Sequence, residues 1–349
     1  MTGPQSDLPP ATTPADASGA GRSAEHIPVL LDAVIEALAP HDDGVYVDGT
    51  FGGGGYAEAL LNAAHCRVFG IDRDPDAVRR GRGLAERHGG RLRILEGRFG
   101  DMAQLLAPVN ADPVAGIALD LGVSSIQLDA PERGFSFRFD GPLDMRMSGA
   151  GQSAADLVAT LSESDLACVI GAFGEERFAR RIARAIATAR QNRNIRRTTE
   201  LAEIVRTAIP QFEAGQDPAT RTFQALRIAV NDELGELDRG LVAAEQLLAP
   251  GGRLAVVSFH SLEDRRVKEF LRRRSAAAPR VSRHQPAGAG PPPSFTVLTR
   301  RAIRPSAAEI AHNPRARAAR LRAAARTASP PWPRNGERRG TGRQRGPHA

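Results

Sequence analysis

The chain has 349 residues, of which 41% are hydrophobic and 25% charged, and this composition fits a globular protein with room for two domains. No apolar run approaches the ~20 residues that a transmembrane helix needs, and no basic segment followed by an apolar core marks a signal peptide. The two cysteines, Cys66 and Cys168, match no metal-ligand spacing and are predicted to be reduced. We therefore expect a cytoplasmic protein without a membrane partner.

The net charge of +7 is distributed unevenly along the chain. Residues 311–349 contain ten arginines and one acid, Glu337, which amounts to +9 and leaves −2 for the rest of the chain. The basic character therefore predicts polyanion contact by the C-terminal segment and not by the body of the protein.

The first part of the sequence predicts a disordered segment followed by an α/β domain. Residues 1–24 are rich in Pro, Ala, Thr, Gly and Ser and are predicted to be disordered. From residue 25, a short amphipathic helix is followed by apolar strand patterns that alternate with helical patterns, the strands at 45–47, 67–71, 92–95 and 116–121. This βαβαβαβ order predicts a parallel, doubly wound sheet over residues 25–150.

The second part of the chain interrupts this domain and then completes it. A long loop with aromatic and arginine residues follows residue 121, and such loops are usually functional or disordered. Helical patterns fill residues 151–219, which we interpret as an inserted all-α domain. One long helix is predicted from Thr220 to Leu248. A fifth strand at 253–259, a helix to Arg274 and a last strand at 295–299 then complete the sheet domain over 220–325, and residues 326–349 are predicted to be a disordered basic tail.

The chain is organised around the glycine-rich turn after the first strand, Asp48-Gly49-Thr50-Phe51-Gly52-Gly53-Gly54-Gly55-Tyr56. Glycine leaves no Cβ, so a ligand can lie directly on the main chain, and the following helix offers unpaired N–H groups. Asp72, at the end of the second strand, is placed to bind ribose hydroxyls. The pattern predicts a nucleotide-like cofactor.

Two cofactors fit this pattern. Gly52-x-Gly54-x-x-Ala57 is a loose dinucleotide fingerprint, which leaves an NAD-dependent oxidoreductase open. Asp48 would then lie near the pyrophosphate, whereas a carboxylate in that turn suits the ammonium and sulfonium of S-adenosyl-L-methionine. The residues favour a methyltransferase over a dehydrogenase.

Longer motifs point to one family. They are His26-Ile27-Pro28-Val29-Leu30-Leu31, Asp48-Gly49-Thr50-Phe51-Gly52, Gly70-Ile71-Asp72-Arg73-Asp74-Pro75, Asp120-Leu121-Gly122-Val123-Ser124-Ser125, Gly134-Phe135-Ser136-Phe137, Asp144-Met145-Arg146-Met147, Ser258-Phe259-His260-Ser261-Leu262-Glu263-Asp264 and Asn313-Pro314-Arg315-Ala316-Arg317. Together they resemble the ribosomal RNA small subunit methyltransferase H family over about residues 25–325. The resemblance implies S-adenosyl-L-methionine-dependent methylation of the exocyclic N4 amine of a cytidine in the decoding region of 16S rRNA. It also implies a Rossmann-like domain interrupted by a helical domain that binds the RNA.

The resemblance also assigns cofactor contacts, which fall on Gly54, Gly55, Tyr56, Asp72, Phe99, Asp120 and Gln127. Phe99 follows the third strand and can enclose adenine, and Asp120 ends the fourth strand at the expected switch-point crevice. Many members of the family carry His where this chain has Tyr56. Each assignment has a structural alternative: the glycines as a tight turn, Asp72 as a helix cap, Phe99 as core and Gln127 as a surface loop residue.

Methylation of a cytosine amine depends on in-line positioning and on acceptors that hold the amine. Asp120 is the first candidate acceptor, followed by Ser124 and His260, because each lies at or just beyond the end of a strand. An aromatic ring for stacking the base is expected from the loop after the fourth strand, from Phe135, Phe137 or Phe139.

His260 with Glu263 and Asp264 resembles a metal-ligand pattern, but no second His or Cys stands at a ligand spacing, so no metal is expected. The expected partner is 16S rRNA or the small ribosomal subunit. The sequence leaves the oligomeric state open, with a dimer as one alternative. A non-catalytic rRNA-binding or assembly factor with the same fold is the competing interpretation.

Overall fold

The computed structural model describes residues 28–111, 113–209, 217–276 and 291–333. The segment 1–24 and the C-terminal residues 334–349, both predicted to be disordered, lie outside the described residues. No helix within the described ranges is both long and apolar enough to span a membrane.

The fold is built on a seven-stranded sheet with the order β3-β2-β1-β4-β5-β7-β6. The first five strands in this order are parallel, and β7 runs antiparallel to both of its neighbours. The predicted α/β class and doubly wound sheet are therefore confirmed. The strands are β1 Val45–Asp48, β2 Arg67–Asp72, β3 Leu92–Glu96, β4 Val114–Asp120, β5 Leu248–Ser258, β6 Phe295–Val297 and β7 Arg320–Arg326.

The strand β7 is absent from the sequence prediction, which placed the last strand at 295–299. Its sequence, RLRAAAR, lacks the β-branched and aromatic residues that usually mark a strand. Its alanines and arginines therefore give no strand signal. Leu321 and Ala323 are buried, whereas Arg322 ion-pairs with Asp264 across the sheet surface. Arg326 is only 7% exposed, so the ordered fold extends past the predicted boundary of the tail.

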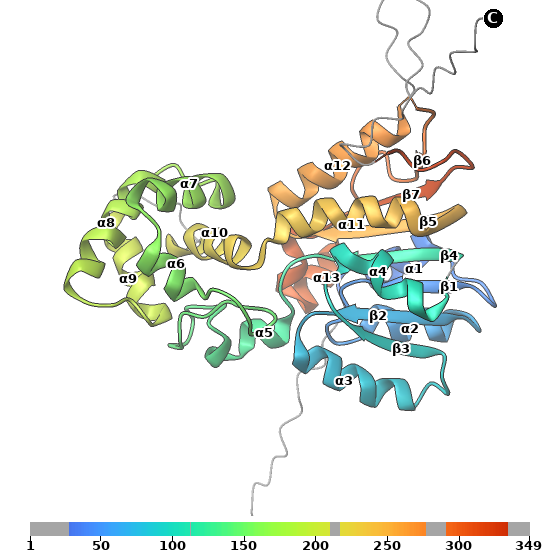
Figure 1. The fold of residues 1–349 in the computed structure, drawn as a ribbon, viewed down its shortest axis with the longest axis horizontal. Helices are drawn as coiled ribbons and strands as arrows, with labels where there is room; N and C mark the ends of the chain where they lie inside the picture. The colour runs from blue at the N-terminus through green and yellow to red at the C-terminus, as the bar shows by residue number, and fades with distance from the viewer. Residues whose placement is uncertain (1–27, 112, 210–216, 277–290, 334–349) are drawn as a thin grey trace, which may run out of the picture.

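Helices cover both faces of the sheet (Figure 1). One core packs α1 Leu31–Leu38, α2 Gly55–Ala63 and α3 Pro75–Glu86 against the strands. The other packs α4 Met102–Leu106, α11 Glu233–Leu247 and α12 Ser261–Ser275 against the opposite face. Because β1 to β5 are parallel, their carboxyl ends share one edge, where ligands bind in folds of this type.

A second lobe stands beside the sheet and has its own core (Figure 1). It contains α6 Ala154–Thr160, α7 Glu163–Gly174, α8 Ala179–Asn192, α9 Thr198–Ala208 and α10 Ala219–Asn231. Part of the long loop after β4 belongs to the same core, through Phe135, Leu143 and Met145. The loop also contains a short helix, α5 Ser125–Asp129, and a further helix, α13 Ala307–His312, precedes β7.

The single long helix predicted from Thr220 to Leu248 is wrong, because the chain forms two helices that meet at Asp232. This residue has a left-handed backbone, φ 50°, a conformation that Asp and Asn tolerate better than most residues. The Asn231 side chain donates to the carbonyls of Arg227 and Met145 and accepts from the Met147 N–H. The helical spacing of apolar residues continues across the break, because each helix buries one face. The face of α10 packs in the lobe and the face of α11 packs against the sheet.

One buried acid adds to the backbone pairing that holds the C-terminal strands in the sheet. Glu245 on α11 is fully buried, and its carboxylate contacts Arg274 at 3.2 Å, the Ser294 hydroxyl and the Trp332 N–H at 3.1 Å. Its backbone carbonyl accepts from Arg326. One side chain therefore ties α11, α12 and the segment after β7 together.

We expect Glu245→Ala to lower the free energy of unfolding by about 3 kcal/mol, because it leaves the Arg274 charge without its partner in a half-buried site. The matched control is Glu269→Ala, which breaks an exposed pair with Arg273 and should cost less than about 0.5 kcal/mol. Urea titrations of both variants measure the difference, and equal destabilisation would contradict this account.

Candidate active site

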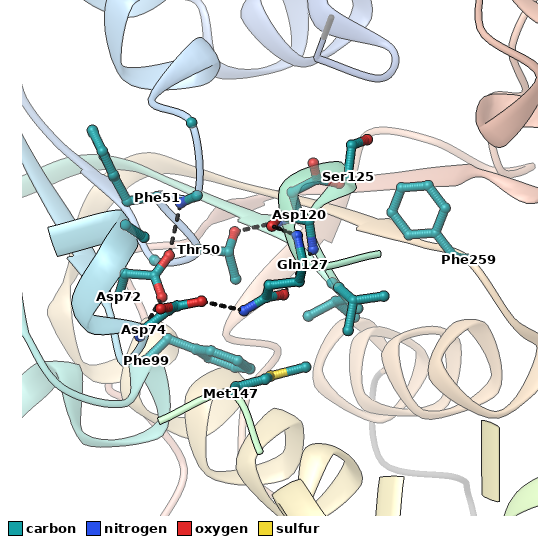
Figure 2. Close-up of a pocket in the computed structure, with 18 of the residues that line it drawn as sticks. Thr50, Phe51, Asp72, Asp74, Phe99, Asp120, Ser125, Gln127, Met147 and Phe259 are labelled. Atoms are coloured by element: carbon teal, nitrogen blue, oxygen red, sulfur yellow. Dashed lines mark hydrogen bonds between the residues drawn. The ribbon is translucent and has the colours of Figure 1, made fainter. Parts of the chain in front are cut away.

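A cavity of about 350 Å³ opens at the carboxyl ends of β1, β2, β4 and β5. It lies where the strand order reverses between β1 and β4, the switch point of a doubly wound sheet. The glycine-rich turn, the end of β2 and the loop after β4 supply its walls, as Figure 2 shows. The cavity is therefore where the topology and the sequence motifs both place a ligand.

The glycine-rich turn presents its backbone to this cavity. Gly52 has φ +52°, and a Cβ added there would meet nothing closer than 3.7 Å, so its free face is open. Gly54 has φ +85°, and a Cβ there would lie 2.7 Å from the Phe51 ring. At Gly55 the added Cβ would lie 2.1 Å from Pro28 Cγ. The turn thus needs glycine both for its own packing and for an open main chain.

The predicted cofactor residues of the turn take different positions. Gly55 and Tyr56 line the cavity, but among the described residues that line it, Gly53 appears in place of Gly54. The Tyr56 hydroxyl donates to the Val29 carbonyl, and the side chain is buried. Burial, followed by the charges of Asp120 and Asp48, raises the pKa of Tyr56 well above its usual range. Tyrosine at this position therefore ties the N-terminal segment to α2.

Asp72 lies at the end of β2 and lines the cavity as predicted. One carboxylate oxygen accepts from the Gly52 N–H at 2.7 Å, and the other accepts from the Asp74 N–H at 2.8 Å (Figure 2). Each oxygen retains a lone pair for a ligand. The alternative role as a helix cap belongs to Asp74, which caps α3 through the Asp76 N–H.

Three carboxyl groups converge on the cavity from the ends of β1, β2 and β4. Burial raises the pKa of Asp48 to about 7, and the charge of Asp72 adds to the shift. Burial, followed by the charges of Asp48 and Glu263, raises the pKa of Asp120 well above its usual range. Asp120 Oδ1 is buried and has no hydrogen-bond partner among the described residues. This arrangement is costly unless a cation or a donor enters.

The remaining cofactor candidates, Phe99 and Gln127, also line the cavity. Phe99 packs against the core formed with α4 and α11, so it serves as core and as cavity wall together. Gln127 is buried, and its amide donates to Asp74 at 2.7 Å and accepts from the Ser124 N–H at 3.0 Å. Its side chain fixes the start of α5 beside the cavity.

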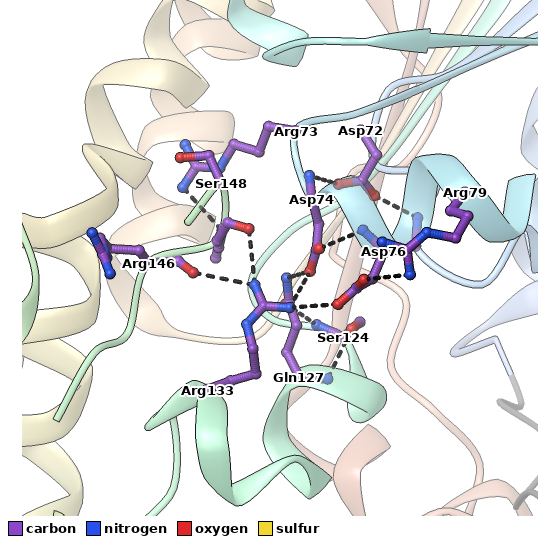
Figure 3. Close-up of polar contacts among 12 residues, drawn as sticks. Asp72, Arg73, Asp74, Asp76, Arg79, Ser124, Gln127, Arg133, Arg146 and Ser148 are labelled. Carbon is purple, nitrogen blue, oxygen red and sulfur yellow. Dashed lines mark hydrogen bonds and ion pairs between the residues drawn. The ribbon is translucent and has the colours of Figure 1, made fainter. Parts of the chain in front are cut away.

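A polar network holds the loop after β4 over the cavity (Figure 3). Arg133 donates to Asp74 at 2.9 Å and to the carbonyl of Met147 at 2.9 Å. Arg73 pairs with Glu236 on α11 at 2.6 Å. The loop that the sequence left without structure is therefore a fixed wall. Asp74 and Arg133 were missed as site residues, although Asp74 stands inside a quoted motif.

The catalytic candidates are brought together only in part. Ser124 lines the cavity with Asp120 and caps α5 by accepting from the Gln127 N–H. His260 caps α12 and is not among the described residues that line the cavity. Its neighbours Phe259 and Glu263 line the cavity instead.

Phe259, which follows β5, lines the cavity along with Phe51 and Phe99, and it takes the place of the predicted loop residues (Figure 2). Phe135 is buried in the lobe core, Phe137 packs edge-to-face on Phe223 at 4.7 Å, and Phe139 is 59% exposed. In the described part of the chain, none of the three lines the cavity. The position of Phe259 at a strand end was the signal that could have identified it.

Glu233, His260 and Glu263 form the one group in the described residues whose ligand atoms could hold a metal, all within 4.8 Å of one another. The sequence spacing did not reveal Glu233. Its carboxylate accepts two bonds from Arg227, at 2.9 and 3.0 Å. Burial favours a neutral Glu263, but His260 and Arg227 hold the pKa of Glu263 below its usual range. Arg227 therefore already supplies a cationic partner to this cluster.

Comparisons with known proteins give one consistent result. The model of the MraW methylase family matches residues 23–327. A protein named Ribosomal RNA small subunit methyltransferase H from Paramagnetospirillum magneticum is 62% identical over 309 residues, which are 88% of this chain and 97% of that protein. A protein of the same name from Rhodospirillum centenum is 63% identical over 306 residues, 87% of this chain and 93% of its own.

Among solved structures, one described as a putative rRNA-methylase from Clostridium thermocellum aligns with 86% of this chain and 97% of its own length. Its sequence identity is 12% and the TM-score is 0.38, a likeness too slight to support an inference.

The raised pKa of Asp48 predicts a dependence of stability on pH. The pKa of Asp48 is about 7 in the folded chain and 3.8 for an ordinary aspartate, so the folded chain binds the extra proton between these limits and this residue lowers stability as the pH rises. Asp48→Asn removes the effect. We expect its stability relative to the parent chain to increase by about 2 kcal/mol from pH 5 to pH 8 in urea titrations.

Asp32→Asn, at an exposed position on α1, is the matched control and should show no such gain. A stability difference between Asp48→Asn and the parent chain that stays constant over this pH range would contradict the assignment.

Proposed function

The chain belongs to the MraW methylase family, as its motifs predicted, and from this premise we propose that it methylates small-subunit ribosomal RNA with S-adenosyl-L-methionine as the methyl donor. The proposed target is the exocyclic N4 amine of a cytidine in the decoding region of the 16S rRNA. Such a substrate would place the protein in the cytoplasm.

The observation that carries the proposal is the set of buried carboxyls around an open glycine backbone. S-adenosyl-L-methionine brings an ammonium and a sulfonium, and both suit a cavity walled by Asp48, Asp72 and Asp120. The pyrophosphate of a dinucleotide would meet the same acids with like charge. The residues therefore fit the sulfonium cofactor and disfavour NAD.

The parts of the donor find matching residues. The open face at Gly52 admits the donor against the main chain, and Asp72 has lone pairs for the ribose hydroxyls. Phe99 offers a ring to the adenine. When bound, S-adenosyl-L-methionine supplies an activated methyl group for transfer.

The target amine is proposed to bind at Asp120. Its Oδ1, which has no partner in the described part of the chain, is free to accept an N4–H bond and to take up the proton that leaves after methylation. A cationic donor bound nearby would favour the ionised form of this carboxyl, which burial otherwise disfavours. Asp120 thus acts as the orienting acceptor, with Ser124 beside it.

The base itself is proposed to stack on Phe259, after leaving its own stack in the RNA. This ring lies beside the start of the loop after β4, with its Cδ2 3.8 Å from the position that a Cβ of Gly122 would take. The helical lobe would hold the RNA through exposed arginines near and on α8, at positions 177, 180, 181 and 184.

Methyl transfer tests the proposal directly. We expect the protein to transfer tritium from labelled S-adenosyl-L-methionine to 16S rRNA or to small subunits that lack the modification, with N4-methylcytidine as the labelled nucleoside after digestion. RNA binding without transfer to any maturation intermediate would favour the assembly factor. Binding of nicotinamide dinucleotide without S-adenosyl-L-methionine would favour the oxidoreductase.

Asp72→Ala is expected to weaken S-adenosyl-L-methionine binding by about 10- to 100-fold in calorimetry, since it removes charge-assisted bonds to the ribose. Asp32→Ala, which removes an exposed acid outside the cavity lining, is the control and should bind normally. Unchanged affinity in Asp72→Ala would remove the ribose assignment.

Phe259→Ala is expected to lower kcat/KM for RNA by about tenfold or more, because base–aromatic stacking is worth about 1–3 kcal/mol per base. Its affinity for S-adenosyl-L-methionine should stay close to that of the parent chain. Phe139→Ala, at an exposed ring outside the cavity lining, is the matched control, and a larger effect there than at Phe259 would return the stacking role to the loop.

A further inference from the structure

A second cavity of about 130 Å³ lies directly beside the first, at the end of β5. Phe259 lines both cavities, so one ring separates them. The polar residues around the second cavity are His260, Ser261, Arg304, Arg317 and Arg320. They come from the start of α12 and from the two segments that flank α13, which are far apart in the sequence.

The charge of this cavity is positive and only partly neutralised. Arg320 pairs with Asp264 at 3.0 Å, and the same carboxylate also pairs with Arg322 at 2.7 Å. Arg304 and Arg317 are exposed, and neither has a carboxylate partner within the ranges that the structure describes. Two guanidinium groups thus remain to bind an anion.

The other polar groups at the cavity leave this balance unchanged. His260 faces Glu263, with 3.1 Å between its Nε2 and the carboxylate. The Ser261 hydroxyl donates to Glu175, and Glu175 is paired with Arg265 at 2.8 Å. The start of α12 adds the positive end of a fifteen-residue helix to the same side.

We propose that this second cavity binds a backbone phosphate of the RNA strand, adjacent to the nucleotide whose base enters the first cavity. The inference rests on the proposed function, because it takes the RNA as given and assigns where its backbone lies. Arginine forks match phosphate oxygens bidentately. The shared wall at Phe259 puts the base on one side of the ring and the phosphate on the other.

The site explains two features that methyl transfer alone does not. Arg317 closes the motif that begins at Asn313, and Asn313 and Arg315 line the first cavity while Arg317 lines the second. Ile303, beside Arg304, is 39% exposed and offers an apolar contact to a neighbouring base or sugar. One short segment therefore spans the cofactor crevice and the proposed phosphate site.

The test compares two double variants that each remove two positive charges. Arg304→Gln/Arg317→Gln removes the unpaired arginines, and Arg79→Gln/Arg82→Gln removes two exposed arginines on α3 as the matched control. Affinity for a single-stranded oligoribonucleotide is measured over a series of salt concentrations. Thermal melting of each variant reports whether it folds.

We expect the Arg304/Arg317 variant to lose about tenfold or more in RNA affinity, and its slope of log K against log salt concentration to fall by about 0.7 for one lost phosphate contact. The control should keep the slope of the parent chain. A methylphosphonate linkage next to the target cytidine should weaken binding by the parent chain and add no further loss in the Arg304/Arg317 variant.

Equal slopes and affinities in the two double variants, or no RNA binding by the parent chain, would overturn the phosphate site. Failure of the proposed function would give a different result. Tritium transfer would then be absent, while the slope of log K against log salt concentration would still be smaller in the Arg304/Arg317 variant than in the parent chain.

Discussion

The structure depends on one electrostatic constraint, which is that three carboxyl groups end neighbouring strands inside one cavity. Asp48, Asp72 and Asp120 are partly or fully removed from water, and burial raises the pKa of each. Asp72 accepts from two backbone N–H groups, whereas Asp120 Oδ1 has no partner in the described part of the chain. A protein tolerates such a cost where a ligand offsets it, and a cationic methyl donor is the ligand that matches its sign.

The rest of the fold keeps this cavity in shape. The sheet brings the acids together because its order reverses between β1 and β4. Arg133 fixes the loop after β4 as a wall, and that loop joins the core of the helical lobe. At Asp232 the chain leaves the lobe and enters α11, which lies beside the cavity. RNA held by the lobe and by the second cavity would thus approach the donor from a defined side.

The sequence predicts the sheet well, and it identifies most of the proposed donor residues that the fold brings to one cavity, because strand alternation and the glycine turn are local signals. It fails where tertiary contacts decide. The apolar spacing of α10 and α11 runs through Asp232, and the alanines of β7 hide a strand whose neighbours supply its stability. Phe259 was overlooked, although it stands at a predicted strand end, because the sequence does not show that the end of β5 lies beside Gly122. Arg320 and Arg322, counted in the basic C-terminal segment 311–349, are paired with Asp264 in the sheet.

The central claim is that a sulfonium donor rests on the bare backbone of the glycine turn, between the acids of β1, β2 and β4. A crystal structure of the protein with S-adenosyl-L-methionine tests it most directly. The account predicts the ribose hydroxyls on Asp72, the adenine against Phe99 and the methyl group facing Asp120. Density for the donor in another place, or an adenine or ribose bound away from Phe99 and Asp72, would contradict it.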